Sequence, residues 1–219
     1  MDDWKRVLAF VHLCAVALCA QQTGEIRGVV VDAQGKTVAD AVVECRLIDN
    51  RPFVGVLPKA TTDKDGKFSI VNLMPGEYKL YPAKEKDGYP NLYWGVYDGA
   101  SGTQITVGPL APVEGLVLVL GQKAAILSGT VVDAVTNQPI SHVIVHLWRT
   151  DRAGSLGFGQ ESSLRVLLPT GVPVGISIQS PGYQEWFYKG ISESSGVSGS
   201  TFGPTEELRM NLKLTPTVN

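Results

Sequence analysis

The sequence contains the stretch Glu25-Ile26-Arg27-Gly28-Val29-Val30-Val31-Asp32, whose pattern returns as Ile126-Leu127-Ser128-Gly129-Thr130-Val131-Val132-Asp133. Each copy continues with a polar turn and a second apolar run, residues 41–48 in the first copy and 143–148 in the second. Both copies close on an alternating run, residues 114–120 and 207–214. The chain therefore repeats one unit, and both copies are expected to share one fold.

These runs have the alternation and the residue types of β-strands. In the last run the residues expected to face inward are Leu208, Met210, Leu212 and Leu214. The pair Asp65-Gly66, between two extended segments, predicts a tight hairpin. A sheet that is apolar on one side needs a second sheet to cover it. We therefore predict an all-β chain of two tandem β-sandwiches, each with six or seven short strands, after an N-terminal signal peptide.

Composition agrees with this prediction and excludes several other classes. The 219 residues are 44% hydrophobic, enough for one large domain or two small ones. The 24 Gly and 13 Pro, with only 18% charged residues, favour strands and turns over long helices and coiled coils. With 19 Lys and Arg against 21 Asp and Glu, the chain lacks the basic excess expected of a nucleic-acid-binding protein.

Residues 1–20 are expected to be a signal peptide. Lys5 and Arg6 precede an apolar run over residues 7–20, which is shorter than the roughly 20 residues that span a bilayer. Cleavage after Ala20 is the first interpretation, and retention of the segment as an N-terminal anchor is the alternative. A lipid on Cys19 is disfavoured because bulky Leu18 precedes it. The mature chain then has no membrane span and is secreted, periplasmic or at the cell surface.

Four segments of the first copy share a pattern with a known family: residues 28–32 (GVVVD), 38–43 (VADAVV), 62–68 (TDKDGKF) and 73–78 (LMPGEY). Together they resemble the carboxypeptidase regulatory-like domain. That family has a prealbumin-like, seven-stranded sandwich and is often grouped with the carbohydrate-binding-like folds. The resemblance therefore implies two tandem seven-stranded, Greek-key-type β-sandwiches. The second copy keeps residues 129–133 and Pro139-Ile140 but lacks the Asp-Gly turn, so it is a divergent copy. The resemblance implies an accessory, non-catalytic secreted module, without the peptidase domain that names the family.

The expected domains are residues 24–121 and 125–215. The join between them reaches about 13 Å at most, so the two domains should touch. Val117 and Val119 are apolar where the second copy has Arg209 and Asn211. This difference suggests either a surface covered by the second domain or a hydrophobic edge.

Cys45 is the one cysteine outside the signal, so no disulfide can form within the mature chain. Alternation places Cys45 on the apolar face of its strand, and the repeat aligns it with Leu147. We expect a buried core residue rather than a reactive thiol.

Residue patterns for catalysis or metal binding are weak. His142 and His146 would lie about 13 Å apart on a strand, too far to share one metal ion. Asp63-Lys64-Asp65-Gly66 lacks the later Glu of a calcium loop and is expected to be a turn. We therefore expect no catalytic residues, no metal, no cofactor and no enzymatic activity.

Aromatic clusters follow the fifth strand of each copy and supply the candidate binding residues. These residues are Tyr93, Trp94 and Tyr97 in the first copy and Trp186, Phe187 and Tyr188 in the second. The first interpretation is that these rings cap the ends of the sandwiches, and the alternative is that flat rings stack on sugars. Capping is favoured for Trp94, and a ligand surface is favoured for Trp186, which has polar neighbours. The leading interpretation is a secreted or cell-envelope binding or structural module, whose partner is a glycan or another envelope protein. The alternative is a carbohydrate-binding accessory protein.

Overall fold

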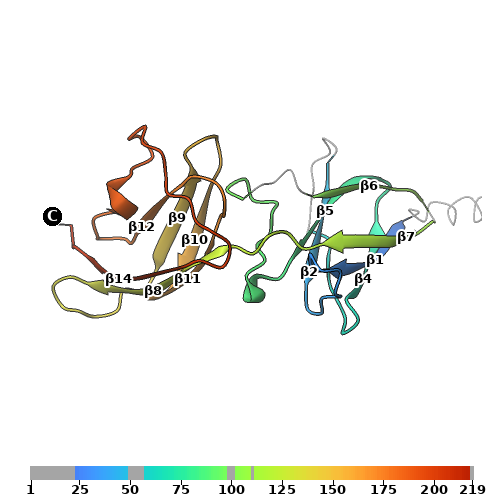
Figure 1. Ribbon diagram of the computed structural model, residues 1–219, viewed down its shortest axis with the longest axis horizontal. Helices are drawn as coiled ribbons and strands as arrows, with labels where there is room; N and C mark the ends of the chain where they lie inside the picture. The colour runs from blue at the N-terminus through green and yellow to red at the C-terminus, as the bar shows by residue number, and fades with distance from the viewer. Residues whose placement is uncertain (1–22, 49–56, 98–101, 110, 218–219) are drawn as a thin grey trace, which may run out of the picture.

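Two β-sandwiches lie end to end along the long axis of the molecule (Figure 1). The computed structural model describes residues 23–48, 57–97, 102–109 and 111–217. The expected signal peptide, residues 1–20, lies outside the described residues. Within them no helix is long and apolar enough to cross a membrane.

The first sandwich holds seven strands in two sheets. They are β1 (Gly24–Val31), β2 (Val42–Leu47), β3 (Lys59–Thr61), β4 (Lys67–Leu73), β5 (Gly76–Ala83), β6 (Thr103–Val107) and β7 (Val113–Val119). One sheet has the order β4-β1-β7 and the other β3-β2-β5-β6. The first and last strands, β1 and β7, pair in parallel, while the other pairs are antiparallel.

The second sandwich repeats this topology strand for strand. Its strands are β8 (Ala125–Asp133), β9 (Val143–Arg149), β10 (Ser155–Gln160), β11 (Ser163–Leu168), β12 (Val174–Gln179), β13 (Trp186–Phe187) and β14 (Glu207–Leu214). The sheets β11-β8-β14 and β10-β9-β12-β13 correspond to those of the first sandwich, and β8 and β14 are again parallel. The prediction of two all-β sandwiches is confirmed.

Period-two alternation decides which side chains enter the cores. In β14 the inward Met210 and Leu214 are buried, and Leu208 and Leu212 are half-buried, while the residues between them are exposed. Cys45 is fully buried in the first core, as expected, and the aligned Leu147 is fully buried in the second.

The Asp65-Gly66 turn differs from the expected hairpin. Asp63 N donates to Lys67 O at 2.9 Å and Gly66 N to Asp63 O at 3.0 Å, so the turn is tight. However, β3 before it pairs with β2, and β4 after it pairs with β1. The turn therefore carries the chain from one sheet to the other, since sheet partners are chosen by packing and not by the turn.

The suggestion that the second domain covers Val117 and Val119 is wrong. Each valine is 56% exposed on β7. The contact between the sandwiches comes instead from a segment that follows β5. Of the two alternatives for these valines, the structure shows the hydrophobic edge.

Candidate functional site

Residues 84–97, here called the junction segment, leave β5 and reach the second sandwich. The segment starts with a bridge in which Lys84 N donates to Tyr89 O at 2.9 Å and Tyr89 N to Lys84 O at 3.1 Å. Gly88 has φ +90°, a left-handed conformation suited to glycine, and its carbonyl accepts Ala124 N at 2.8 Å. The segment is thereby held against the link between the two sandwiches.

The end of the junction segment is part of the second hydrophobic core. Val96 is fully buried and Tyr97 is 5% exposed, and both belong to the cluster built on Leu127 and Leu168. Tyr97 OH donates to Leu167 O at 2.7 Å, and burial raises the pKa of the Tyr97 phenol above its usual range. The hydroxyl therefore stays a hydrogen-bond donor at any physiological pH.

Three arginines of the second sandwich donate hydrogen bonds to backbone carbonyl oxygens of the junction segment. Tyr97 O accepts Arg152 Nη2 at 2.8 Å and Arg149 Nη1 at 3.3 Å. Arg165 of β11 donates to Lys86 O at 3.2 Å. The buried Arg149 guanidinium is also paired with the Asp151 carboxylate, which lowers the pKa of Asp151. Sequence reasoning missed these arginines because nothing local marks their partners.

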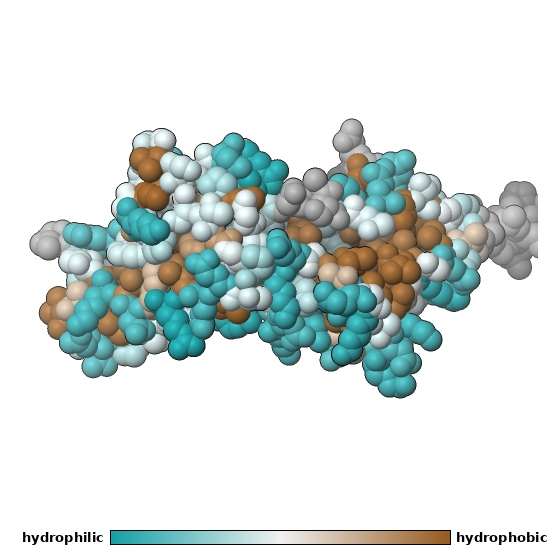
Figure 2. Space-filling view, in the orientation of Figure 1, coloured by the Kyte–Doolittle hydropathy of each residue, from teal (hydrophilic) through white to brown (hydrophobic). Residues whose placement is uncertain are grey.

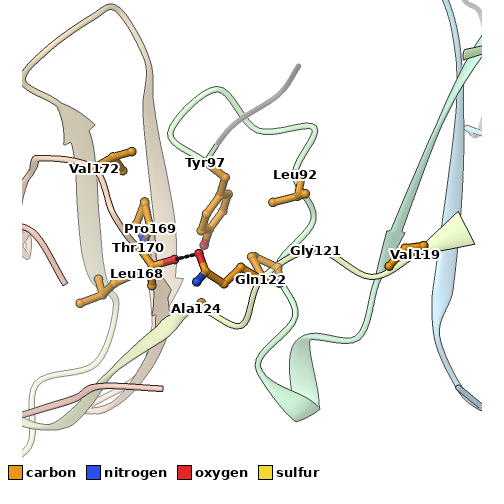
Figure 3. Close-up of a pocket in the computed structure, with 11 residues that line it drawn as sticks. Leu92, Tyr97, Val119, Gly121, Gln122, Ala124, Leu168, Pro169, Thr170 and Val172 are labelled. Carbon is orange, nitrogen blue, oxygen red and sulfur yellow. Dashed lines mark hydrogen bonds between the residues drawn. The ribbon is translucent and has the colours of Figure 1, made fainter. Parts of the chain in front are cut away.

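A cavity of about 330 Å³ lies at the junction between the sandwiches (Figure 3). Its walls combine the junction segment, the link and the turn after β11. The lining residues are Pro90, Leu92, Tyr97, Val119, Gly121, Gln122, Ala124, Leu168, Pro169, Thr170 and Val172. None of them is charged, and Thr170 Oγ1 donates to Gln122 Oε1 at 3.4 Å across one wall. The lining of the cavity is therefore uncharged, and it combines apolar side chains with the polar side chains of Gln122 and Thr170.

Tyr93 and Trp94 lie on the outer face of the first sandwich, where they form a stack with Arg46. The Arg46 guanidinium carbon is 3.5 Å from the Tyr93 ring centroid and 5.6 Å from that of Trp94. Tyr93 meets Trp94 edge-on at 5.3 Å and Tyr81 at 5.5 Å. The rings remain 37% and 38% exposed, so this aromatic stack presents aromatic surface to solvent.

A polar groove of about 810 Å³ runs beside the aromatic stack. Its lining residues are Asp40, Val42, Glu44, Thr61, Ala83, Lys84, Glu85, Lys86, Asp87 and Asn91. Two of them connect it to the stack: Glu44 pairs with Arg46 Nη2 at 2.9 Å, and Asn91 Oδ1 accepts Tyr93 N at 3.0 Å. Lys84 Nζ pairs with Asp87 at 2.8 Å. The groove thus joins carboxylate and amide groups to an exposed aromatic edge.

The second aromatic cluster is on the other sandwich and is less exposed. Trp186 and Phe187 form β13, and Tyr188 follows in the turn Tyr188–Gly190. All three are half-buried, and Trp186 and Tyr188 pack against the second core. Phe187 meets buried Trp148 edge-on at 6.5 Å. The six candidate residues therefore divide into an exposed pair, a buried Tyr97 and a half-buried trio.

Within the described part of the chain, no three His, Cys, Asp or Glu side chains are grouped so that they could hold a metal ion. His142 precedes β9, and His146 lies in β9 with its ring 5.5 Å from that of Trp148. The Asp63 carboxylate accepts the backbone N–H groups of Lys67 and Asp65, and these hydrogen bonds lower its pKa. Asp63 thereby stabilises its own turn.

The match to a known family lies within the first sandwich and the start of the junction segment. Residues 25–91 match the family model of the carboxypeptidase regulatory-like domain, which confirms that resemblance for this part of the chain. No curated protein matches the sequence.

Solved structures are similar to this chain only at low identity. The Bacillus anthracis TIE protein is 17% identical with a TM-score of 0.35; the match covers 89% of this chain and only 34% of that one. A streptococcal ancillary pilin is 15% identical, with a TM-score of 0.37 and coverage of 91% and 64%. A minor pilin of Streptococcus agalactiae is 13% identical, with a TM-score of 0.36 and coverage of 90% and 97%. At these values the likeness bears on neither activity nor partners.

Proposed function

We propose that this protein is a non-catalytic, exported binding or structural module whose two sandwiches act as one elongated unit. The observation that carries the proposal is the insertion of Tyr97, from the first sandwich, into the core of the second. A core shared in this way resists independent movement of the two domains, because separation would expose a buried aromatic ring. A stiff unit of this kind suits a spacer or a scaffold that presents a binding surface.

The rigidity is tested with Tyr97→Ala, measured by small-angle scattering and by ¹⁵N relaxation of the two sandwiches. In the wild type both sandwiches should tumble with one correlation time. In the variant the times should separate and the scattering should report a flexible dumbbell. The matched control is Tyr93→Ala, which removes an exposed ring from the same segment and should leave the tumbling unchanged. Independent tumbling in the wild type would contradict the proposal.

Export and the absence of catalysis have their own tests. N-terminal sequencing of exported material should find a chain that begins near Gln21, and retained Met1 would contradict cleavage after Ala20.

A broad hydrolase substrate panel should give no turnover with the mature chain. Turnover that survives repurification and disappears on unfolding would contradict the non-catalytic part of the proposal.

A second candidate is carbohydrate binding, which is favoured by the aromatic stack beside the polar groove. Exposed rings stack on the apolar faces of sugars, while carboxylates that line the groove, such as Glu44, accept hydrogen bonds from sugar hydroxyls. A glycan array with wild type and Trp94→Ala tests this function. Trp94→Ala should lose the bound glycans with an unchanged melting temperature. Trp186→Ala, at the half-buried cluster, is the comparison. If Trp94→Ala loses the glycans and Trp186→Ala keeps them, the binding surface lies on the first sandwich.

A further inference from the structure

Strand β7 is the edge of its sheet and carries exposed apolar side chains. Among the described residues it pairs on one side only, with β1. Val117 and Val119 are each 56% exposed, and Figure 2 shows the hydrophobic area that covers β7 of the first sandwich. An edge strand with free backbone groups and apolar side chains is a template for a further strand.

The second sandwich protects the corresponding edge. In β14 the outward positions hold Arg209, Asn211 and Lys213, all exposed. Arg209 is paired with Glu207 at 3.0 Å, and Lys213 Nζ donates to Asn137 at 2.7 Å. Charged side chains on an edge strand oppose pairing with another chain. Strands β7 and β14 occupy the same place in the topology, but β14 has charged side chains on its exposed face where β7 has valines. Such charges are one of the features that prevent edge-to-edge association.

We propose that β7 pairs with β7 of a second copy of this chain, in an antiparallel arrangement about a two-fold axis near Leu118. This inference goes beyond the proposed function and does not depend on it. A two-fold pairing places Val117 of one copy beside Val119 of the other, and the two sheets become one continuous sheet.

The charges along β7 favour a second copy as the occupant. Glu114 precedes the valines, and its side chain is 61% exposed although it pairs with Arg27 of β1 at 3.0 Å. Lys123 follows them in the link, where its ammonium lies 5.2 Å from the Tyr89 ring. An antiparallel copy therefore brings each Glu114 carboxylate towards the Lys123 ammonium of the other chain. A parallel arrangement would instead place like charges side by side. The strand and the link that follows it are therefore complementary to a second copy, through the valines and through the pair formed by Glu114 and Lys123. Each second sandwich then points away from the other, because β7 runs along the long axis of the molecule (Figure 1).

The test is sedimentation of the mature full-length chain over a concentration series. The wild type should show a monomer–dimer equilibrium, and Val117→Lys should raise the dissociation constant about tenfold or more. The matched control is Val71→Lys, because Val71 is 54% exposed on β4, the opposite edge of the same sheet. This control should dimerise as the wild type does, and far-ultraviolet circular dichroism should show that both variants are folded.

A charge exchange separates a second copy from any other occupant. Glu114→Lys should weaken the dimer, and the double variant Glu114→Lys with Lys123→Glu should restore it. A wild type that stays monomeric throughout the series would overturn the proposal, whether or not another protein binds β7. So would equal weakening by the Val71 and Val117 variants, or a double variant that is weaker than the single one.

Discussion

The hydroxyl of Tyr97 donates a 2.7 Å hydrogen bond to the carbonyl oxygen of Leu167. Tyr97 ends a segment that leaves the first sandwich, whereas Leu167 lies in β11 of the second. Both residues are buried, so the bond satisfies a polar pair that water does not reach. The junction thus resembles the interior of a domain: the Tyr97 ring lies in an apolar core, and its hydroxyl is hydrogen-bonded.

Tyr97→Phe should destabilise the second sandwich by about 1–3 kcal/mol, because the ring stays while a buried carbonyl loses its donor. Chemical denaturation followed by the fluorescence of Trp148 and Trp186, both in the second sandwich, measures the change. Tyr93→Phe is the control, since exposed Tyr93 should give nearly wild-type stability. Equal stabilities for the two variants would show that the Tyr97 hydroxyl contributes nothing.

Cys45 should react slowly with a thiol reagent in the native protein and rapidly after unfolding. The side chain is fully buried, and burial raises the pKa of the Cys45 thiol to about 12, so the reactive thiolate is scarce. Cys45→Ser should cost roughly 1–3 kcal/mol, because a hydroxyl would be buried without an assured partner. Equal reaction rates in native and unfolded protein would contradict the burial of Cys45.

Trp94→Ala should change the free energy of unfolding by about 1 kcal/mol or less, because the ring lies on the surface against Tyr93 and Arg46. Trp148→Ala should cost about 3–5 kcal/mol, since Trp148 is only 3% exposed and packs on Gly175. Thermal melts of both variants measure the difference. A Trp94 variant as unstable as the Trp148 variant would indicate that Trp94 caps the sandwich.

Asp133 should make the second sandwich sensitive to acid. Its carboxylate accepts the backbone N–H groups of Thr136 and Val135 and the Tyr183 hydroxyl, and these hydrogen bonds lower the pKa of Asp133. In the unfolded chain the pKa of this carboxyl is about 3.9, and in the folded protein it is lower. The ionised carboxylate therefore stabilises the fold above about pH 3.9, and this stabilisation is lost as the pH falls through the folded-state pKa. The melting temperatures of wild type and Asp133→Asn should therefore differ at about pH 7, and the difference should shrink progressively as pH falls below about 4. A difference independent of pH would contradict this role.

Prediction from sequence succeeded where the cause is local. The inward positions of Cys45 in β2 and of the leucines in β14 follow from alternation along each strand. The repeat gave independent support for Cys45, because it aligns this residue with Leu147 in the second copy. It failed at the Asp65-Gly66 turn, which was expected to join two strands of one sheet. A turn type constrains the neighbouring residues, but sheet membership depends on strands far along the chain.

The same limit applies to the candidate binding residues in the aromatic clusters. Tyr93, Trp94 and Tyr97 lie within five residues of sequence, yet two of them are exposed and one is buried in the other sandwich. Arg46, which stacks on Tyr93, comes from β2 and carries no mark of this partner in the sequence. Composition therefore predicted an aromatic region but not which of its rings face solvent.

The duplicated all-β architecture could be predicted from the amino-acid sequence, because strand period, turn residues and the repeat are properties of short stretches of chain. The tertiary structure alone decided that Tyr97 joins the second core and that β7 keeps an exposed valine edge. It also decided that the groove of the first sandwich opens beside Arg46 and Tyr93. These features depend on which distant surfaces meet, and that choice is made by the packing of both sandwiches together.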